Sequence, residues 1–361
     1  MANRVKGIVR LCMAAILLAA GSAARSESAT SVNAALGAQF DQHPLLMVGE
    51  LHRNGQLHAF LRQLIRDPAF ICRVDDVVVE FGNARLQSVI DTYIAGGDVP
   101  DAQLQIVWRD TTVLLVWNSP VYRQFYETVR DINQKHVCPH PIRVVLGDPP
   151  IDWSTVKAEK DYEKFSDRDG YFATVVEQQV LAKKHRALLI AGELHALKQV
   201  PKDEPEGPDG PDVAQLIERR HPGALFSVVT VPSPSAAKAL GMGPPPSFKV
   251  VRGSDIEQAD FAVIAPAWTA TLVVVNGKHV WQQGPAKYWP RMGGVVDGVL
   301  YLGGDETSVY PSPTIYLDPV YQQQLRHRAL LIKQFNGQDF MPVLDDLIKE
   351  GEQVRKQQAQ Q

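Results

Sequence analysis

Five short, mainly apolar runs, separated by longer helical patterns, constrain the fold of this 361-residue chain more than any other feature. The runs are Leu45–Val48, Val77–Glu80, Arg143–Leu146, Ala187–Ala191 and Ala224–Val231. The helical patterns are Gln56–Arg66, Ala84–Ala95, Pro120–Lys135, Gly170–Lys184 and Val213–Arg220. Apolar strands joined by helices are typical of a parallel sheet that is covered on both sides. The sequence therefore predicts an α/β fold with a mostly parallel central sheet and helices on both faces.

Residues 1–24 are typical of a secretory signal peptide. Arg4, Lys6 and Arg10 precede an apolar run at Leu11–Ala20, and small residues follow it. A run of about ten apolar residues is too short to span ~30 Å of hydrocarbon as a helix. We therefore expect a periplasmic or secreted protein with no membrane span after signal removal. Loss of three basic residues and no acid would take the net charge from −3 to −6, so nucleic acid is not expected as a partner.

The rest of the chain is predicted to form a single α/β domain over residues 36–320. Its regular core covers about residues 44–231, and residues 232–320 are less regular. Further strands are expected there at Phe261–Ala265, Thr271–Val275 and Val299–Leu302. The composition of Pro201–Asp212 and Pro232–Ser247 predicts loops. Residues 321–361 are expected to form a C-terminal helix and a polar tail.

Ionisable residues gather where the first four predicted strands end. Glu50 and His52 follow the first strand, and Glu80 ends the second. Asp148 follows the third strand, and Glu193 and His195 follow the fourth. In open parallel sheets, ligands bind at the carboxyl ends of the strands. The sequence therefore predicts that these six residues form one catalytic cleft, whereas four other histidines precede strands and are expected at the opposite edge (His136, His140, His185 and His221).

The tetrapeptide Gly-Glu-Leu-His occurs twice in the chain, at residues 49–52 and 192–195. If the backbone stays extended there, Glu50 and His52 point to one side and Leu51 points into the core. A helix cap with surface histidines would explain one copy, and a tandem duplication would explain two. The two regions resemble each other only in the apolar strand and the tetrapeptide, and so limited a similarity argues against duplication. The acids on the intervening strands favour one shared site.

The Gly-Glu-x-His word after the first strand, the glutamate that ends the second and a Gly-x-x-His word after a later strand resemble the erythromycin esterase / ChaN / Tiki superfamily. The resemblance covers roughly Pro44 to Val231 and implies an α/β fold with its site at the strand C-termini. It implies that His52 and His195 are the central pair, with Glu50, Glu80 and Glu193 as their carboxylates. Members include histidine-dependent esterases, metal-dependent proteases and proteins of haem or iron uptake, so the resemblance leaves the substrate open.

The residues themselves favour water as the nucleophile. The sequence contains no Gly-x-Ser-x-Gly elbow, His-Glu-x-x-His helix or glycine-rich phosphate loop. A histidine held by a carboxylate can activate the water. A divalent metal held by His52, Glu80 and His195 can do the same. Both routes predict an exported hydrolase that cleaves an ester or amide in a small molecule or peptide.

A non-catalytic periplasmic haem- or metal-binding protein of the ChaN type remains the alternative. A haem binder presents an axial ligand in an apolar pocket, and a ring of four carboxylates fits that poorly. We therefore expect haem less than a divalent metal, and the sequence does not decide whether any cofactor is used.

Two arginines near the predicted site are candidates for substrate binding. Arg53 follows His52 directly, and Arg109 lies in a polar word inside an apolar segment. A structural ion pair with Asp110 or another acid is the alternative for Arg109.

The mature chain has two cysteines, Cys72 and Cys138, each five residues before a predicted strand. Equal offsets place both at the N-terminal edge of a parallel sheet, where neighbouring strands would allow a disulfide. Two buried free thiols are the alternative.

Overall fold

The computed structural model describes residues 32–200, 211–265, 269–275, 278–284, 289–304 and 307–360, with the backbone alone described between 269 and 284. A seven-stranded sheet runs in the order β3-β2-β4-β1-β5-β9-β6. All neighbours are parallel except β6 and β9. Its strands are β1 (Leu45–Glu50), β2 (Asp76–Asn83), β3 (Arg143–Asp148), β4 (Ala187–Gly192), β5 (Leu225–Thr230), β6 (Ser247–Val250) and β9 (Gly298–Tyr301). The predicted α/β fold is confirmed.

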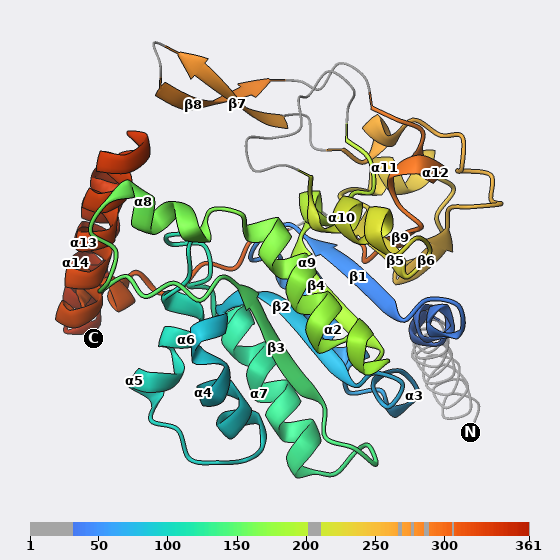
Figure 1. The fold of residues 1–361 in the computed structure, drawn as a ribbon, viewed down its shortest axis with the longest axis horizontal. Coiled ribbons are helices and arrows are strands. Elements are labelled where there is room, and N and C mark those ends of the chain that lie inside the picture. Colours follow the sequence, from blue (N-terminus) through green and yellow to red (C-terminus); the bar gives the residue numbers. More distant parts are fainter. Residues whose placement is uncertain are drawn as a thin grey trace, which may run out of the picture.

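Helices precede or follow most of these strands (Figure 1). The α-helices are α2 (Gly55–Leu64), α3 (Pro68–Ile71), α4 (Gln87–Ile94), α5 (Asp101–Leu104), α6 (Ile106–Arg109), α7 (Pro120–Gln134), α8 (Glu159–Tyr162), α9 (Arg168–Gln179), α10 (Val213–Arg220), α11 (Pro234–Ala239), α12 (Met292–Val295), α13 (Pro319–Asn336) and α14 (Met341–Gln358). The short 3-10 helices are η1 (Gln39–Asp41), η2 (Ala84–Leu86), η3 (Glu163–Phe165), η4 (Leu181–Lys183), η5 (Glu193–Ala196), η6 (Phe261–Val263) and η7 (Pro313–Leu317). A separate antiparallel pair is formed by β7 (Thr269–Val275) and β8 (Lys278–Gly284).

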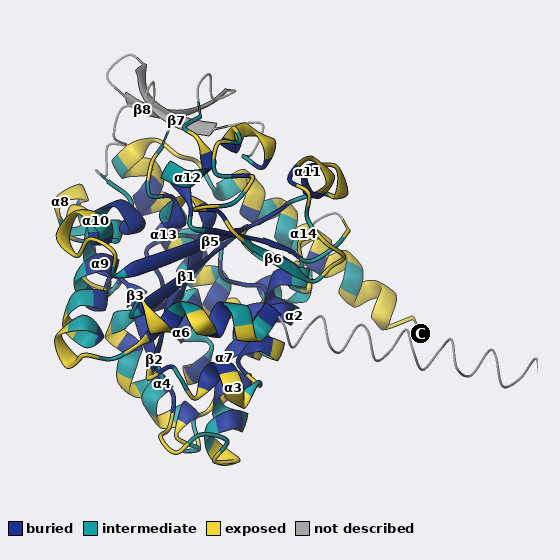
Figure 2. Cartoon of the chain, turned by 90° about the vertical axis from the view of Figure 1, so that its right-hand side faces the viewer, coloured by how far each residue is buried: buried dark blue, intermediate teal, exposed yellow. Residues whose placement is uncertain are grey.

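Alternate strand residues enter two separate cores, because successive side chains of a strand point to opposite faces. On one face, Leu46 and Val48 of β1 pack with α2, α4 and α7. On the other face, Leu45 and Met47 pack with α9, α10, α11 and α12. Figure 2 shows the central strands buried between these two layers. The helices on both faces explain why the strands are apolar throughout.

Two predictions for the less regular part of the chain are wrong. The expected strand Phe261–Ala265 is the 3-10 helix η6, because the Asp260 side chain accepts a hydrogen bond from Ala262 N and caps a helical turn. The expected loop Pro232–Ser247 contains α11, which begins with Ser233 as its N-cap and a proline in the first turn. The expected strand Val299–Leu302 is β9, one residue earlier.

The C-terminal residues, where we expected a helix and a polar tail, form the helices α13 and α14. In Figure 1, α13 and α14 lie together at one end of the molecule. Arg328 of α13 is buried, forms an ion pair with Asp110 and donates to Arg109 O at 2.7 Å. These contacts attach the C-terminal helices to the segment that follows α6. The predicted boundaries of the domain remain predictions.

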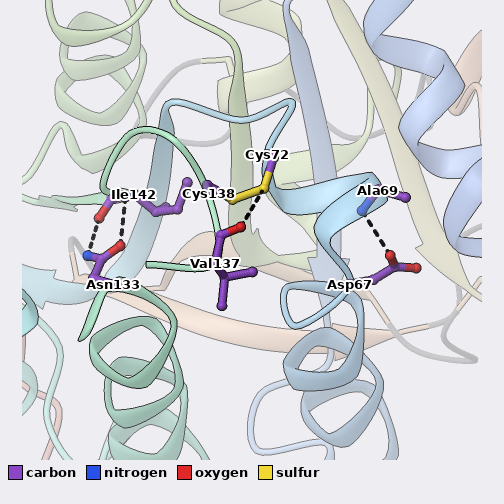
Figure 3. The surroundings of a disulfide bond; sticks show 7 residues. All are labelled: Asp67, Ala69, Cys72, Asn133, Val137, Cys138 and Ile142. Atoms are coloured by element: carbon purple, nitrogen blue, oxygen red, sulfur yellow. Dashed lines mark hydrogen bonds between the residues drawn. A yellow bond between two sulfur atoms is a disulfide. The ribbon is translucent and has the colours of Figure 1, made fainter. Parts of the chain in front are cut away.

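The predicted disulfide joins Cys72 to Cys138, with a Cα–Cα separation of 5.2 Å (Figure 3). Cys72 caps the C-terminus of α3, and Cys138 lies between α7 and β3. Asn133 fixes this second segment, since its side chain bonds both Ile142 N and Ile142 O at 2.8 Å. The bridge forms because β2 and β3 are neighbours.

Within the described residues, no helix has both the length and the apolar character needed to cross a membrane. The predicted signal peptide and residues 201–210 of the predicted loop lie outside the described residues.

Candidate active site

The carboxyl ends of four adjacent strands bring the predicted site residues to one edge of the sheet. The strands β3, β2, β4 and β1 are neighbours in that order, and Asp148, His195 and Glu50 lie at or just after the ends of β3, β4 and β1. Glu80 was predicted to end its strand, but it lies within β2, which continues to Asn83. The register pairs Glu50 with Gly192 and residue 83 with Asp148. The common edge that the sequence predicted therefore holds the acids in an order that differs from their order in the chain.

Glu50 is a buried carboxylate that organises the first Gly-Glu-Leu-His word. It accepts hydrogen bonds from His52 Nδ1 at 3.2 Å and Tyr122 OH at 3.1 Å, and its second oxygen bonds His58 Nε2. Burial would raise the pKa of Glu50, but His58 and His52 outweigh it and lower that pKa. Glu50 is therefore held as an ionised group that fixes the orientation of His52.

His52 has one ring nitrogen on this carboxylate and keeps 37% of its side chain exposed. Trp117 packs edge-on against its ring, with the centroids 4.6 Å apart. A hydrogen bond from Nδ1 to Glu50 leaves Nε2 of the neutral ring as the acceptor nitrogen. His52 thus combines a fixed orientation with an accessible basic atom.

The glycines of the two tetrapeptides allow the two tetrapeptides to pack against each other. A β-carbon on Gly192 would lie 2.8 Å from His52 Cε1 and 3.3 Å from His195 Cδ2. Both imidazoles therefore lie against the same glycine, on the side where a side chain would otherwise project. A β-carbon on Gly49 would lie 2.9 Å from the Cα of Glu193. Each glycine is needed because a side chain at its position would prevent close approach of the other tetrapeptide.

His195 lies among carboxylates at the second tetrapeptide. Its Nδ1 is 2.6 Å from Asp169 Oδ1 and 3.7 Å from Asp212 Oδ1, and its Nε2 is 3.4 Å from Glu80 Oε1. Burial would lower the pKa of His195, but the charges of Glu80 and Asp169 raise that pKa well above its usual value. His195 is therefore an imidazolium at neutral pH.

Arg168, at the start of α9, neutralises the two remaining acids. It donates to Glu80 Oε1 at 2.5 Å and to Asp148 Oδ1 at 3.4 Å. Burial would raise the pKa of Glu80, but His195 and Arg168 hold that pKa well below its usual value. A small pocket contacts this group and is lined by Glu80, Gly147, Asp148, Arg168, Asp169, Phe172, Ala191, His195 and Val213.

Burial raises the pKa of Asp148 to about 6, above its ordinary value of 3.8, despite Arg168 and hydrogen bonds from Thr112. Between these values the folded state binds the proton more strongly than the unfolded chain. Raising the pH through this window therefore lowers the free energy of unfolding. The Asp148→Asn variant cannot ionise at this position and serves as the reference. We expect the free energy of unfolding of the wild type, minus that of the variant, to fall between about pH 4 and about pH 6 and then to stay level. Urea unfolding across this range measures the difference, and a constant difference would contradict the raised pKa.

The orientation that we predicted for Leu51 is wrong, and the leucine of the second tetrapeptide is exposed as well. Leu51 is 41% exposed and Leu194 is 48% exposed. The strands end before these residues, since a turn follows Glu50 and η5 begins at Glu193. The leucines therefore lie beside the two histidines as exposed apolar groups. Glu193 is buried at the start of η5.

The segment after α6 covers this edge of the sheet and carries several contacts. Thr112 bonds Asp148, Trp117 packs on His52, and Arg53 donates to the carbonyls of Leu115 and Val116 at 3.3 and 3.2 Å. Arg109 does not make the ion pair with Asp110 that we considered, because Arg85 and Arg328 bind that acid. Arg109 stacks over the ring of Tyr321 at 4.6 Å instead.

The residues that fit a metal ion differ from the predicted set. Among the described residues, donor atoms of Asp169, His195 and Asp212 lie within 4.8 Å of one another. His52, Glu80 and His195 form no such group there, and Glu80 already accepts from Arg168 and from Gly192 N at 2.7 Å. A divalent ion would thus be held by the first group, where it could polarise a bound oxygen.

Several residues that contact the predicted ones were not expected from the sequence. They are His58, Trp117, Tyr122, Arg168, Asp169 and Asp212. Asp169, Arg168 and Asp212 lie at the starts of α9 and α10. A helix that connects parallel strands begins near the edge where the preceding strand ends, so charged residues at helix starts were a usable signal.

Comparison with known proteins gives similarity in fold. No protein-family model and no curated protein sequence matches the chain. A succinoglycan biosynthesis protein of known structure is 10% identical with a TM-score of 0.54, covering 76% of this chain and 91% of that one. An erythromycin esterase mutant in its open conformation is 11% identical with a TM-score of 0.44, covering 76% and 93%. A haem-bound ChaN of Campylobacter jejuni is 11% identical with a TM-score of 0.33, covering 52% and 82%. At 10% identity, the succinoglycan biosynthesis protein shows a similar fold alone.

Proposed function

We propose that the chain is an exported hydrolase that cleaves an ester or amide with a water molecule activated by His52. The observation that carries this proposal is the contrast between the two histidines. His52 is oriented by a buried carboxylate and is open to solvent, whereas His195, on the same side of Gly192, is held as a cation. A histidine that is held by a carboxylate and open to solvent can act as a general base, and a neighbouring cation can stabilise developing negative charge.

In the proposed reaction, His52 Nε2 takes a proton from water, and the resulting hydroxide forms a bond to the carbonyl carbon. The carbonyl oxygen becomes negative, and the His195 imidazolium stabilises that charge. The tetrahedral intermediate then breaks its bond to the alcohol or amine. The leaving group receives the proton from His52, so that acid and alcohol or amine are released and the histidine returns to its neutral state.

Arg168 supports this chemistry without touching the substrate. Glu80 and Asp148 would repel a developing oxyanion, and Arg168 bonds both of them. Glu50 holds the Nδ1 proton of His52 so that Nε2 is the free base. We assign Glu50, Glu80, Asp148 and Arg168 positioning roles. Glu193, which is buried beside Gly49, belongs to the same edge and supports the packing of the two words.

Two further observations favour the finer parts of the proposal. The disulfide is consistent with export, because such bonds persist in oxidising compartments. The exposed side chains of Leu51 and Leu194 beside the histidines favour a substrate with an apolar group next to the bond that is cleaved.

An ester panel on the mature chain, without residues 1–24, tests this function. We expect hydrolysis of p-nitrophenyl esters that rises with acyl chain length and is unchanged by a chelator. Loss of activity with chelator, restored by a divalent ion, would replace the metal-free step with a metal-assisted one at Asp169, His195 and Asp212. No turnover of any ester, together with a Soret band after addition of haem, would overturn the hydrolase and favour the ChaN-type binder.

A further inference from the structure

A second group of cations and hydrogen-bond donors lies beside His52. Arg53 follows His52 in the chain, and Asn118 follows Trp117, which packs on the His52 ring. Asn118 accepts from Tyr321 OH at 2.7 Å and donates to Tyr316 OH at 3.4 Å. Arg109 stacks on Tyr321. The segment that carries Trp117 and Asn118 therefore connects the hydrolytic site to this second group of residues.

Arg109 is a guanidinium that stacks on an aromatic ring, and its side chain has no hydrogen-bonding partner among the described residues. Its carbon lies 4.6 Å from the centroid of the Tyr321 ring, and its buried Nε has no acceptor among the described residues. No ion pair joins Arg109 to an acid in the described part of the chain. A guanidinium carries five N–H donors in a planar fork that matches an oxyanion with two oxygens. The stacked guanidinium therefore keeps at least its Nε donor without an acceptor in the described part of the chain.

Arg53 adds a second positive charge with spare donors. Its Nε and Nη2 donate to two backbone carbonyls of the covering segment, and Tyr310, which is 67% exposed, stacks on it with the ring centroid 5.2 Å away. Two neutral carbonyls leave its charge uncompensated. Its Nη1 makes no hydrogen bond within the described residues.

Contacts through Asn118 connect both arginines to Tyr316. The Asn118 side chain bonds Tyr316 OH and Tyr321 OH, and Arg109 stacks on Tyr321. Arg53 bonds the carbonyls of Leu115 and Val116, just before Asn118 in the chain. Burial raises the pKa of the Tyr316 hydroxyl, while Asn118, Arg53 and Arg109 oppose that rise. Its hydroxyl accepts from Asn118 and donates to no acceptor among the described residues. The charge of Glu350, which is exposed on α14, adds to the rise in the pKa of Tyr316. Two guanidinium groups and one phenol are thus joined by a chain of contacts, and neither arginine forms an ion pair among the described residues.

We propose that Arg53, Arg109 and Tyr316 bind an anionic group of the substrate, a carboxylate or a phosphate, while the ester or amide lies against His52. The inference rests on the proposed function, since it names the class of substrate for that site. Arg109 supplies a bidentate fork, Arg53 supplies charge, and Tyr316 donates one hydrogen bond. An oxyanion removes the uncompensated charge and satisfies donors that the protein leaves free.

A binding measurement tests the site without any turnover. The probes are benzoate, phenyl phosphate and neutral benzyl alcohol, titrated calorimetrically into the mature chain. We expect one or both anions to bind and benzyl alcohol not to bind. Arg109→Gln should weaken anion binding by about tenfold or more, the range for a hydrogen bond to a charged group. Arg109→Lys, which keeps the charge without the fork, should lose less.

Arg66→Gln is the matched control, because Arg66 is exposed just after α2 and its side chain donates only to Arg62 O within the described chain. It should bind the anions as the wild type does. Equal affinities for anion and alcohol, or an Arg109→Gln variant that binds as the wild type does while circular dichroism shows it folded, would overturn the anion site. Tighter binding of phenyl phosphate would indicate a phosphate on the substrate, and tighter binding of benzoate would indicate a carboxylate.

A kinetic measurement separates this inference from the proposed function. A p-nitrophenyl ester of a dicarboxylic acid is compared with the neutral ester of equal length. We expect a higher kcat/KM for the anionic ester in the wild type and in Arg66→Gln, and loss of that preference in Arg109→Gln. Anion binding without hydrolysis of either ester would keep the site and reject the hydrolase. Hydrolysis of both esters with equal kcat/KM, together with no anion binding, would keep the hydrolase and reject the anion site.

Discussion

Replacing His52 with alanine is expected to abolish most hydrolysis while leaving the protein folded. A positioned general base contributes about 10²- to 10⁴-fold to the rate, so kcat should fall by that factor. The side chain is 37% exposed at the end of a strand, so little packing is lost. Initial rates on the best ester of the panel measure the first effect, and urea unfolding measures the second. His195→Ala should also reduce kcat strongly, because the developing charge loses its imidazolium.

Two variants make this result specific. His140→Ala removes an exposed histidine that lies before β3, and it should have wild-type activity. Glu50→Gln should reduce kcat and also the free energy of unfolding, because Glu50 is buried and bonds both His58 and Tyr122. Full activity in the His52 or His195 variant would exclude our assignment of the base or of the cation.

Removing the disulfide is expected to cost about 4 kcal/mol of unfolding free energy. The bridge closes a loop between residues 66 apart in sequence, and the chain-entropy model gives this magnitude for a loop of that length. Cys72→Ser with Cys138→Ser should therefore lower the urea midpoint strongly. Activity at low temperature should persist, because the bridge lies at the N-terminal edge of the sheet and the site lies at the other edge.

Reduction provides the control for this second prediction. Dithiothreitol should lower the midpoint of the wild type toward that of the double variant and should not change the variant. Thiol titration of the denatured, unreduced protein isolated after export should find no free thiol. Two free thiols in that sample would contradict both the bridge and an oxidising destination.

The sequence by itself determined the class of fold and the contents of one sheet edge. Strands such as Leu45–Val48 are apolar on both faces, and only a sheet covered on both sides can bury them. Parallel strands all end at the same edge, so an acid after each strand had to be near the others whatever the strand order. The same reasoning placed Cys72 and Cys138 at the opposite edge. These conclusions depend only on the local pattern of apolar residues and on the parallel direction of the strands.

The tertiary structure alone decided which groups touch. The position of β4 between β2 and β1 brings Gly192 against His52, and strand order is set by packing of whole helices rather than by any local residue. Asp169 reaches His195 because α9 starts at the site edge. His58 reaches Glu50 because α2 folds back on β1.

The leucines of the two tetrapeptides show the limit of local reasoning. Alternation predicted that Leu51 would be buried, yet it is exposed because the strand ends one residue earlier and the chain turns. The unpartnered guanidinium of Arg109 is a similar case, since its stacking on Tyr321 joins two residues that lie far apart in the sequence. Local pattern determines what a strand can bury, whereas the partners of a charged side chain depend on contacts between distant parts of the chain, which only the folded structure brings together.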